Sequence, residues 1–213
     1  MKKLHHSKKQ KIRGWKRRKR SIQLWRQQML ELDMETVRSE DFDYAKLWIY
    51  PFYSISPIDP PHWFQRLLLG EMIDVYAHWQ KQMEQEGEPF YLKIWLYEPN
   101  FILSQIVVAY RSRLHFYDEH FQPAPTARPF PFADTGALAE KLSKLDWQLC
   151  IQEELYWSNE LQDNIDKGLR TKAEVKRLID RAYATETMQY GGEEQTVYKV
   201  QIGDVWLGTW KTD

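Results

Sequence analysis

The sequence predicts an α+β fold with a mostly antiparallel sheet whose helices lie on one face. Segments in which apolar residues alternate, as in strands, are interspersed with segments in which they recur every three or four residues, as in helices. Between residues 44 and 157 the order is strand, helix, strand, strand, helix, strand, which is the order of a ferredoxin-like core. We therefore expect a βαββαβ core, followed by a C-terminal helical segment and a β-hairpin.

The first strand and the long helix after it are predicted from composition and from end signals. Residues 44–53 alternate and are rich in aromatic and β-branched side chains, which favours a strand. Asp59 is a candidate N-cap followed by Pro60, and Gly87 is a candidate helix stop. The apolar residues between them are spaced as on one helix face: Phe64, Leu68, Met72, Val75, Trp79 and Met83.

Two strands, an extended connection, a short helix and a fourth strand complete the expected core. Residues 90–97 alternate, and a turn separates them from an apolar strand at 102–110, whose bent continuation to Phe121 is left open. Four prolines within residues 122–132 predict an extended surface segment, because proline has no amide donor for a sheet or helix. A short helix is expected after Asp134, and residues 147–157 alternate again.

The C-terminal extension is predicted to hold two short helices and the hairpin. The first helix ends at Gly168, and Thr171 with Glu174 forms a capping box for the second. The hairpin is placed around Gly203-Asp204, because glycine at the first turn position suits a type II′ turn. Its strands are residues 197–202 and 205–210.

Charge is distributed unevenly along the chain. The formal net charge is zero, yet 12 of the 30 Lys and Arg, and none of the 30 acidic residues, lie in the first 30 residues. We therefore divide the chain into a basic N-terminal arm, residues 1–33, and a single α+β domain, residues 34–213. The domain has its core at 43–158 and its extension at 159–213. A dense cationic segment gains most from a polyanion or from an anionic membrane surface.

The end of the basic arm is predicted to be an amphipathic helix. Apolar residues follow at spacings of three, four and three: Ile22, Trp25, Met29 and Leu32. We expect this stripe to pack on the domain. Cations at the N-terminal end of a helix oppose its dipole, so residues 1–20 are expected to be ordered by a partner.

The first two strands carry the same unusual pattern on one side. That side, which we call the aromatic sheet face, consists of Tyr44, Lys46, Trp48, Tyr50, Tyr91, Lys93, Trp95 and Tyr97. Aromatic rings and lysines on an open sheet resemble surfaces that hold single-stranded nucleic acid, where bases stack on the rings. Alternatively, Trp206, Trp210 and the last helices cover this face, or two subunits bury it in a homodimer.

Composition also indicates the cellular compartment in which the protein is expected. Cys150 is the lone cysteine, so no internal disulfide can form, and no leader with a cleavage site precedes the body. We therefore expect a cytoplasmic protein. The apolar runs are far shorter than the roughly 20 residues of a membrane span, so any membrane contact is expected to be peripheral.

Other candidate sites are weaker. His115, Asp118, Glu119 and His120 are metal-ligand types, but without a known ligand spacing they favour a polar strand end or turn. Glu153 lies among apolar strand positions, where an ion pair with Arg111 or Arg113, or a strand face that is exposed there, is favoured over an acid–base role. The turn Tyr190-Gly191-Gly192-Glu193 is interpreted as a loop. No zinc-protease, nucleophile-elbow, nucleotide-binding or kinase signature is present, so no cofactor, metal or catalytic residue is assigned and an enzyme is not favoured.

Three functions remain open at this point. The first is binding of RNA or single-stranded DNA through the basic arm and the aromatic sheet face. The second is a dimeric small-molecule-binding protein or enzyme with a pocket at that face, and the third is a structural or partner-docking protein. The candidate nucleic-acid contacts are Lys8, Lys9, Lys11, Arg13, Lys16, Arg17, Arg18, Lys19, Arg20, Arg26, Lys46, Trp48, Lys93 and Trp95.

Overall fold

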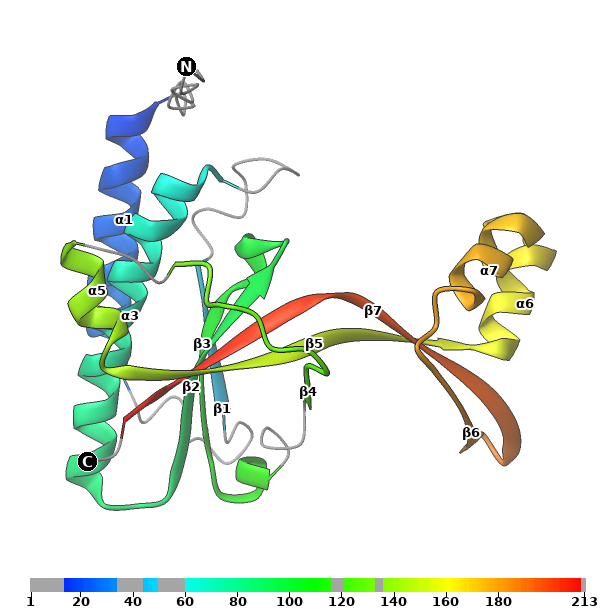
Figure 1. Ribbon diagram of the computed structural model, residues 1–213. Helices are drawn as coiled ribbons and strands as arrows, with labels where there is room; N and C mark the ends of the chain where they lie inside the picture. The colour runs from blue at the N-terminus through cyan, green and yellow to red at the C-terminus, as the bar shows by residue number, and fades with distance from the viewer. Residues whose placement is uncertain (1–13, 34–43, 50–59, 116–120, 133–135, 212–213) are drawn as a thin grey trace, which may run out of the picture.

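The computed structural model describes residues 14–33, 44–49, 60–115, 121–132 and 136–211. Within them the chain forms an antiparallel sheet and five α-helices (Figure 1), which confirms the α+β class. The helices are α1 (Trp15–Leu30), α3 (His62–Glu86), α5 (Ala137–Leu142), α6 (Ser158–Asp166) and α7 (Lys172–Ile179). The strands are β1 (Tyr44–Trp48), β2 (Phe90–Glu98), β3 (Gln105–Tyr110), β4 (Gln122–Pro123), β5 (Leu145–Trp157), β6 (Ala184–Tyr190) and β7 (Glu193–Trp210).

The sheet order is β1-β3-β2-β7-β5-β4, and β6 pairs with β7. Helices α1, α3 and α5 lie together against one face (Figure 1), and the main apolar core lies between them and the sheet. We call this part the body. Burial of the apolar side chains of α3 on the sheet is the dominant favourable term here, and Phe64, Leu68, Met72 and Trp79 are fully buried.

The ferredoxin-like arrangement is not confirmed. Strand β3 lies between β1 and β2 and is antiparallel to both, as in the first half of such a core. The fourth strand of the prediction, β5, however, pairs with β7 and β4 rather than with β1. The long strand β7 occupies the position beside β2, so the C-terminal strand is part of the central sheet.

Strands β5 and β7 continue beyond the body as a two-stranded ribbon, which carries α6, α7 and β6 at its far end (Figure 1). We call residues 153–201 the distal lobe. The pairing of β5 with β7 shifts register between Gln152 and Glu153, where a bulge bends and twists a strand. The lobe has a small apolar core of its own, made by Leu161, Val175, Val197 and Val200.

The hairpin predicted from residues 197–202 and 205–210 is not formed, because both segments belong to the single strand β7 and no turn lies at Gly203-Asp204. These two residues lie inside β7, where Gly203 pairs with Gln152 and Asp204 with Ile151 and Glu98. A hairpin is formed instead by β6 and β7 around Gly191 and Gly192, whose φ angles are 63° and 87°. Two positive φ values are what a type I′ turn requires, so the loop predicted at 190–193 is this turn.

Several predicted boundaries are confirmed. Gly87 ends α3 in the left-handed conformation, with a φ of 72°, and Thr171 and Glu174 form the complete capping box of α7. Strand β3 ends at Tyr110, because Arg111 has a φ of 50° and begins a short 3₁₀ turn, so the strand does not run on past Tyr110. The N-caps differ from the predicted ones: Pro61 precedes α3 and Gly136 precedes α5, while the predicted caps Asp59 and Asp134 lie outside the described residues.

Candidate functional site

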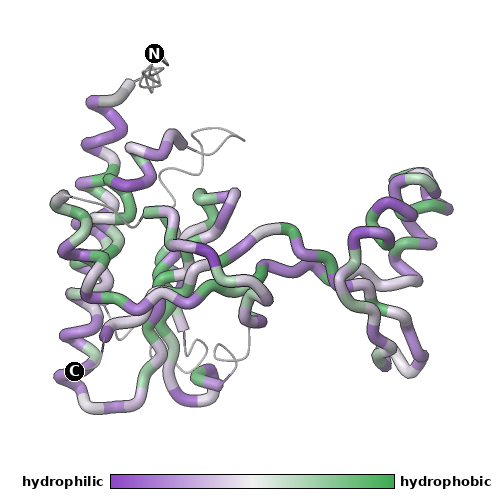
Figure 2. The backbone as a smooth tube through the Cα atoms, in the orientation of Figure 1, coloured by the Kyte–Doolittle hydropathy of each residue, from purple (hydrophilic) through white to green (hydrophobic). Residues whose placement is uncertain are grey.

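Helix α1 carries the cations of the basic arm that the structure describes. Figure 2 shows its first turns as hydrophilic, and they hold the run from Lys16 to Arg20. The predicted stripe is confirmed further along: Ile22 and Trp25 are each 2% exposed and belong to the main core. Trp25 Nε1 also donates to the carbonyl oxygen of Trp48 at 2.9 Å. The cationic run is therefore part of a helix anchored on the body, and the helix begins at Trp15 rather than after residue 20.

The cations on the first turns of α1 face solvent. Lys16, Arg17, Lys19 and Arg20 are exposed and Arg18 is partly exposed. Within the described ranges, none of the five takes part in an ion pair. No acidic residue lies in the first turn of α1 and its N-cap makes no side-chain hydrogen bond, so the positive end of the helix dipole adds to the positive side chains. A bound anion would relieve this repulsion.

Arg26 differs from the cations before it. Its Nε lies 3.1 Å from Oε2 of Glu71, so it joins α1 to α3 and holds the helix in place. Four other predicted contacts, Lys8, Lys9, Lys11 and Arg13, lie outside the described residues.

The aromatic sheet face is covered by the chain itself. Tyr91, Trp95 and Tyr97 are buried, and Trp95 is only 1% exposed. Its ring meets Phe121 edge-on at a centroid distance of 4.8 Å, and Leu103 and Leu114 pack on the same cluster. Trp95 therefore has no free surface on which a base could stack, and the open platform considered above is not formed over it.

The residues expected to cover the aromatic sheet face lie elsewhere. Trp206 belongs to the core on the helix side of the sheet, and Trp210 stacks on Tyr76 of α3, with ring centroids 6.1 Å apart. Of the predicted contacts on the face, Trp48 at its outer end is the ring that remains 38% exposed. The cover comes from residues on either side of β3 and from Phe121.

The two lysines of the aromatic sheet face, Lys46 and Lys93, each lie over an aromatic ring of the same face. Lys46 Nζ lies 5.5 Å from the centroid of the Trp95 ring, and Lys93 Nζ lies 4.7 Å from that of Tyr91, within range of a cation–π interaction. Trp95 Nε1 donates to the Tyr91 hydroxyl at 3.1 Å. Burial lowers the pKa of Lys46. The repeated lysine and aromatic pattern thus forms intramolecular contacts.

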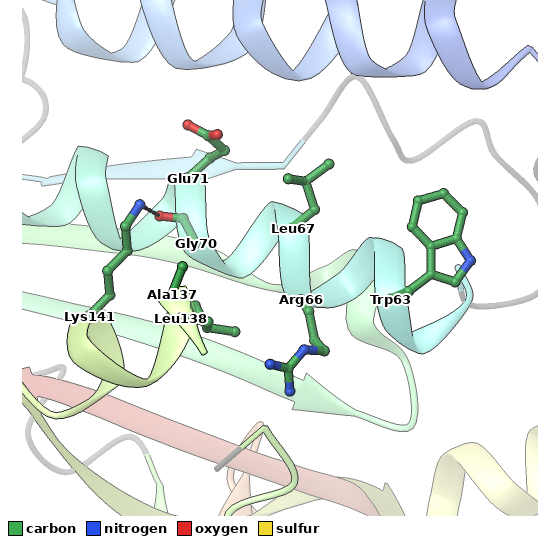
Figure 3. Close-up of a pocket in the computed structure, with 8 residues that line it drawn as sticks. All are labelled: Trp63, Arg66, Leu67, Gly70, Glu71, Ala137, Leu138 and Lys141. Carbon is green, nitrogen blue, oxygen red and sulfur yellow. Dashed lines mark hydrogen bonds between the residues drawn. The ribbon is translucent and has the colours of Figure 1, made fainter. Parts of the chain in front are cut away.

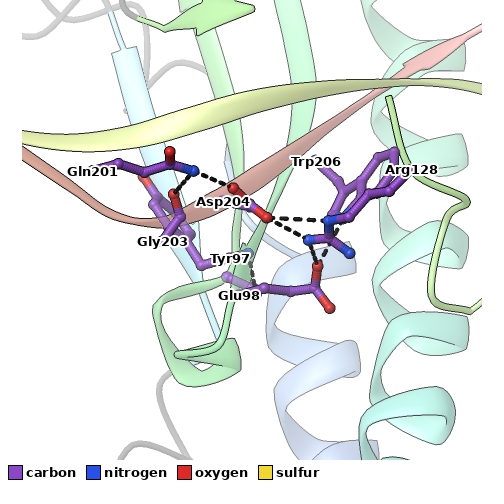
Figure 4. A network of polar contacts seen from close by, with 8 residues as sticks. Tyr97, Glu98, Arg128, Gln201, Gly203, Asp204 and Trp206 are labelled. Carbon is purple, nitrogen blue, oxygen red and sulfur yellow. Dashed lines mark hydrogen bonds and ion pairs between the residues drawn. The ribbon is translucent and has the colours of Figure 1, made fainter. Parts of the chain in front are cut away.

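A polar network joins the proline-rich segment to the sheet (Figure 4). Arg128 donates to the carboxylates of Glu98 on β2 and Asp204 on β7, the latter at 2.7 Å from Nη2. Trp206 Nε1 donates to the same Glu98 carboxylate at 2.9 Å, and Gln201 Nε2 donates to Asp204 at 2.8 Å. No local sequence pattern indicates this network, because its partners are far apart in the chain.

A pocket of about 390 Å³ lies beside this network, where the ribbon leaves the body. It is lined by Glu98, Pro99, Arg128, Gln201, Ile202, Gly203 and Asp204. Because one guanidinium is shared by two carboxylates, the cation is already paired and the three groups together carry a net charge of −1. The arrangement fastens the loop to the sheet and leaves no cation for a ligand.

A second hollow, of about 320 Å³, lies between α3 and α5 (Figure 3). Lys141 reaches across it, donating to the carbonyl oxygen of Gly70 at 3.2 Å and pairing with Asp74 at 2.7 Å. Glu71 at its rim pairs with Arg26. These contacts join three helices, and we assign them a structural role.

Glu153 has a different partner from the one expected. It accepts a hydrogen bond from the Tyr183 hydroxyl, whereas Arg113 lies 5.6 Å from the Tyr44 ring in the body. Burial, together with Glu153, raises the pKa of Tyr183 to about 12, so this phenol stays protonated at neutral pH. The contact is a hydrogen bond inside the distal lobe.

The remaining candidates are Cys150 and the possible metal ligands at residues 115–120. Cys150 is buried, and burial raises the pKa of its thiol, which keeps it protonated and unreactive. Asp118, Glu119 and His120 lie outside the described residues, and no group of three or more His, Cys, Asp or Glu within the described ranges could hold a metal ion. No helix described here is long and apolar enough to cross a membrane.

Comparisons of the chain with protein-family models, with curated proteins and with solved structures found no match.

Proposed function

We propose that the protein binds nucleic acid through phosphate contacts made by α1 and the basic residues before it. The observation that carries the proposal is the run Lys16 to Arg20, four exposed cations and one partly exposed on a helix fixed to the body by Ile22 and Trp25. When cations on a fixed helix bind a polyanion, counterions are released from the polyanion. Binding does not then cost the conformational entropy that a flexible tail would lose.

The proposed contacts are limited to the phosphate backbone, whereas the sequence also suggested stacking of bases on the aromatic sheet face. Preference for a single strand depended on stacking of bases on an open aromatic sheet face, and Trp95 of that face is buried. What remains is electrostatic contact with the phosphate backbone, which is independent of base sequence and is shared by RNA and DNA. We therefore expect binding to both, with affinity set mainly by salt.

The test compares two matched pairs of charge-neutralising substitutions. Arg17→Gln with Arg20→Gln removes two exposed cations from α1, while Lys81→Gln with Lys144→Gln removes two exposed cations from other parts of the body. Binding of a mixed-sequence 24-nucleotide RNA is measured by fluorescence anisotropy between 50 and 300 mM salt. Each lost phosphate contact lowers the slope of log affinity against log salt by about 0.7 for a single strand.

We expect the α1 pair to weaken binding several-fold and to lower the salt slope by about 1.4, with the control pair within about twofold of the parent protein. Equal losses in both pairs would overturn the assignment to α1. Binding to vesicles of anionic lipid without binding to RNA would overturn it in favour of a membrane surface, the other polyanionic partner that such a helix fits.

A further inference from the structure

Helix α7 of the distal lobe carries a second cationic surface. The segment from Arg170 to Arg181 holds five basic residues, Arg170, Lys172, Lys176, Arg177 and Arg181, against two acidic ones, Glu174 and Asp180. Four of the five cations are exposed, and Arg170 is partly buried, 5.5 Å from the ring of Tyr156. This concentration of charge lies far along the chain from the basic arm.

The way in which α7 packs turns these cations outward. Val175 is buried, and Leu178 and Ile179 are partly buried, so the apolar side of the helix faces the lobe. Lys172, Lys176, Arg177 and Arg181 are all exposed, and at 100° per residue Arg177 falls about 200° from Val175, on the opposite side of the helix. The capping box closes the N-terminus, and Lys176 and Arg177 lie in the last turn, where cations suit the helix dipole. The surface is therefore carried by a well-terminated helix.

The cations of α7 are not used to hold the lobe together. In the described part of the chain, none of Lys172, Lys176 and Arg181 takes part in an ion pair. Arg177 lies near Glu174, but that carboxylate already accepts hydrogen bonds from the backbone amide and hydroxyl of Thr171. The net positive charge of the surface is thus available to an external anion.

The neighbouring helix α6 has the opposite charge. Its acidic residues are Glu160, Asp163 and Asp166, and the lysine that follows it, Lys167, pairs with Asp163 at 2.9 Å. A phosphate backbone would be repelled from α6 and attracted to α7. This segregation within one small lobe gives a polyanion a single favourable side of approach.

The ribbon sets α7 apart from α1. Strand β5, which runs from the body through the ribbon into the lobe, has 13 residues, which at about 3.3 Å per residue span roughly 40 Å. The lobe stands at the end of the ribbon away from the helices of the body (Figure 1). A double helix rises about 3.4 Å per base pair, so a duplex of about 12 base pairs matches the length of β5.

We propose that α7 is a second phosphate-contact surface, so that one nucleic acid of sufficient length is held at α1 and at α7 together. This inference rests on the proposed function. Two linked contacts raise the affinity because the second forms at a high effective concentration, and the gain is confined to nucleic acids that reach both surfaces.

The test uses mixed-sequence DNA duplexes of 8 and 24 base pairs, the first being shorter than β5. Affinities are measured for the full-length protein and for the variant Lys172→Gln, Lys176→Gln, Arg181→Gln. The matched control within the lobe compares Lys176→Gln with Lys167→Gln, since the latter removes a cation that already has an acidic partner. Circular dichroism confirms that each variant keeps its helices.

We expect the triple variant to lose at least tenfold in affinity for the 24-base-pair duplex and to lower its salt slope by about 2.7, with affinity for the 8-base-pair duplex unchanged within about twofold. Lys176→Gln should weaken binding to the long duplex more than Lys167→Gln does. Equal effects on the two duplexes, or no effect on either, would overturn the bridging role of α7. If the α1 substitutions weaken binding while the α7 substitutions do not, the proposed function stands and this inference alone fails.

Discussion

At Gly203 the chain has no room for a side chain. A Cβ atom there would lie 2.3 Å from the carbonyl oxygen of Glu98 and 3.0 Å from Oε1 of Gln152. Glycine is therefore required because β2 and β5 both approach β7 closely at this point, where the ribbon leaves the body. A glycine within an alternating segment can mark either a turn or the close approach of another backbone. The sequence alone does not distinguish these two cases at Gly203.

We predict that Gly203→Ala lowers the free energy of unfolding by about 1–3 kcal/mol, as overpacking of a tight site does. Gly70→Ala on α3 is the control: a Cβ there meets nothing closer than Leu138 Cδ1 at 3.6 Å, and alanine favours a helix over glycine by up to about 1 kcal/mol. Urea unfolding measures both. A Gly203→Ala protein as stable as the parent would show that the strands can separate without cost.

Among the elements, α1 carries exposed cations on its first turns and is itself fixed to the body. Two indole groups fasten it: Trp25 Nε1 donates to the carbonyl oxygen of Trp48, and Trp79 Nε1 donates to that of Met29 at 3.1 Å. One bond runs from α1 to β1 and the other from α3 to α1, so the helix is held from both sides. The orientation of its exposed cations follows from these contacts.

We predict that Trp25→Ala destabilises the protein by about 3–5 kcal/mol, because a large buried side chain is removed. Trp25→Phe keeps most of the packing and loses the hydrogen bond, for about 1–2 kcal/mol. Leu24→Ala on the same helix is the control, since Leu24 is 51% exposed and should change stability by less than about 0.5 kcal/mol. Similar losses for Leu24 and Trp25 in urea unfolding would contradict the packing of α1 described here.

At the scale of the whole molecule, the body and the distal lobe differ in how much apolar surface they bury. The body has a large core between helices and sheet, whereas the buried residues of the lobe are Leu161, Val175, Val197 and Val200. A small core supplies little of the apolar burial that offsets chain entropy. The lobe therefore depends on β5 and β7, which run into it from the body.

We predict that amide hydrogens of α6, α7 and β6 exchange with solvent faster than those of β2 and β3, because the lobe opens without global unfolding. Native-state hydrogen exchange followed by NMR measures this difference. Thr171→Ala removes the hydroxyl of the capping box and should speed exchange in α7 while leaving β2 and β3 unaffected. Equal protection throughout would mean that lobe and body unfold as one unit.

Prediction from sequence succeeds here where the signal is local. The periodicity of α3, its end at Gly87, the capping box at Thr171 and the stripe of α1 each depend on residues a few positions apart. The contact of Arg128 with Glu98 and Asp204 joins three distant segments, and no local pattern encodes it. In the candidate site the cations of α1 were identified from sequence, whereas burial of Trp95 under Phe121 was not, because alternation says which residues share a side but not what covers it.

The sequence by itself determined the α+β class, most helices and strands, and the concentration of positive charge in the first 30 residues, because these follow from local periodicity and composition. Only the tertiary structure decided that β7 lies beside β2, that Tyr91, Trp95 and Tyr97 of the aromatic sheet face are buried, and that a lobe with the basic helix α7 stands at the end of a ribbon. Strand pairing and burial depend on residues far apart in the chain, and their register is set by the sum of many weak contacts.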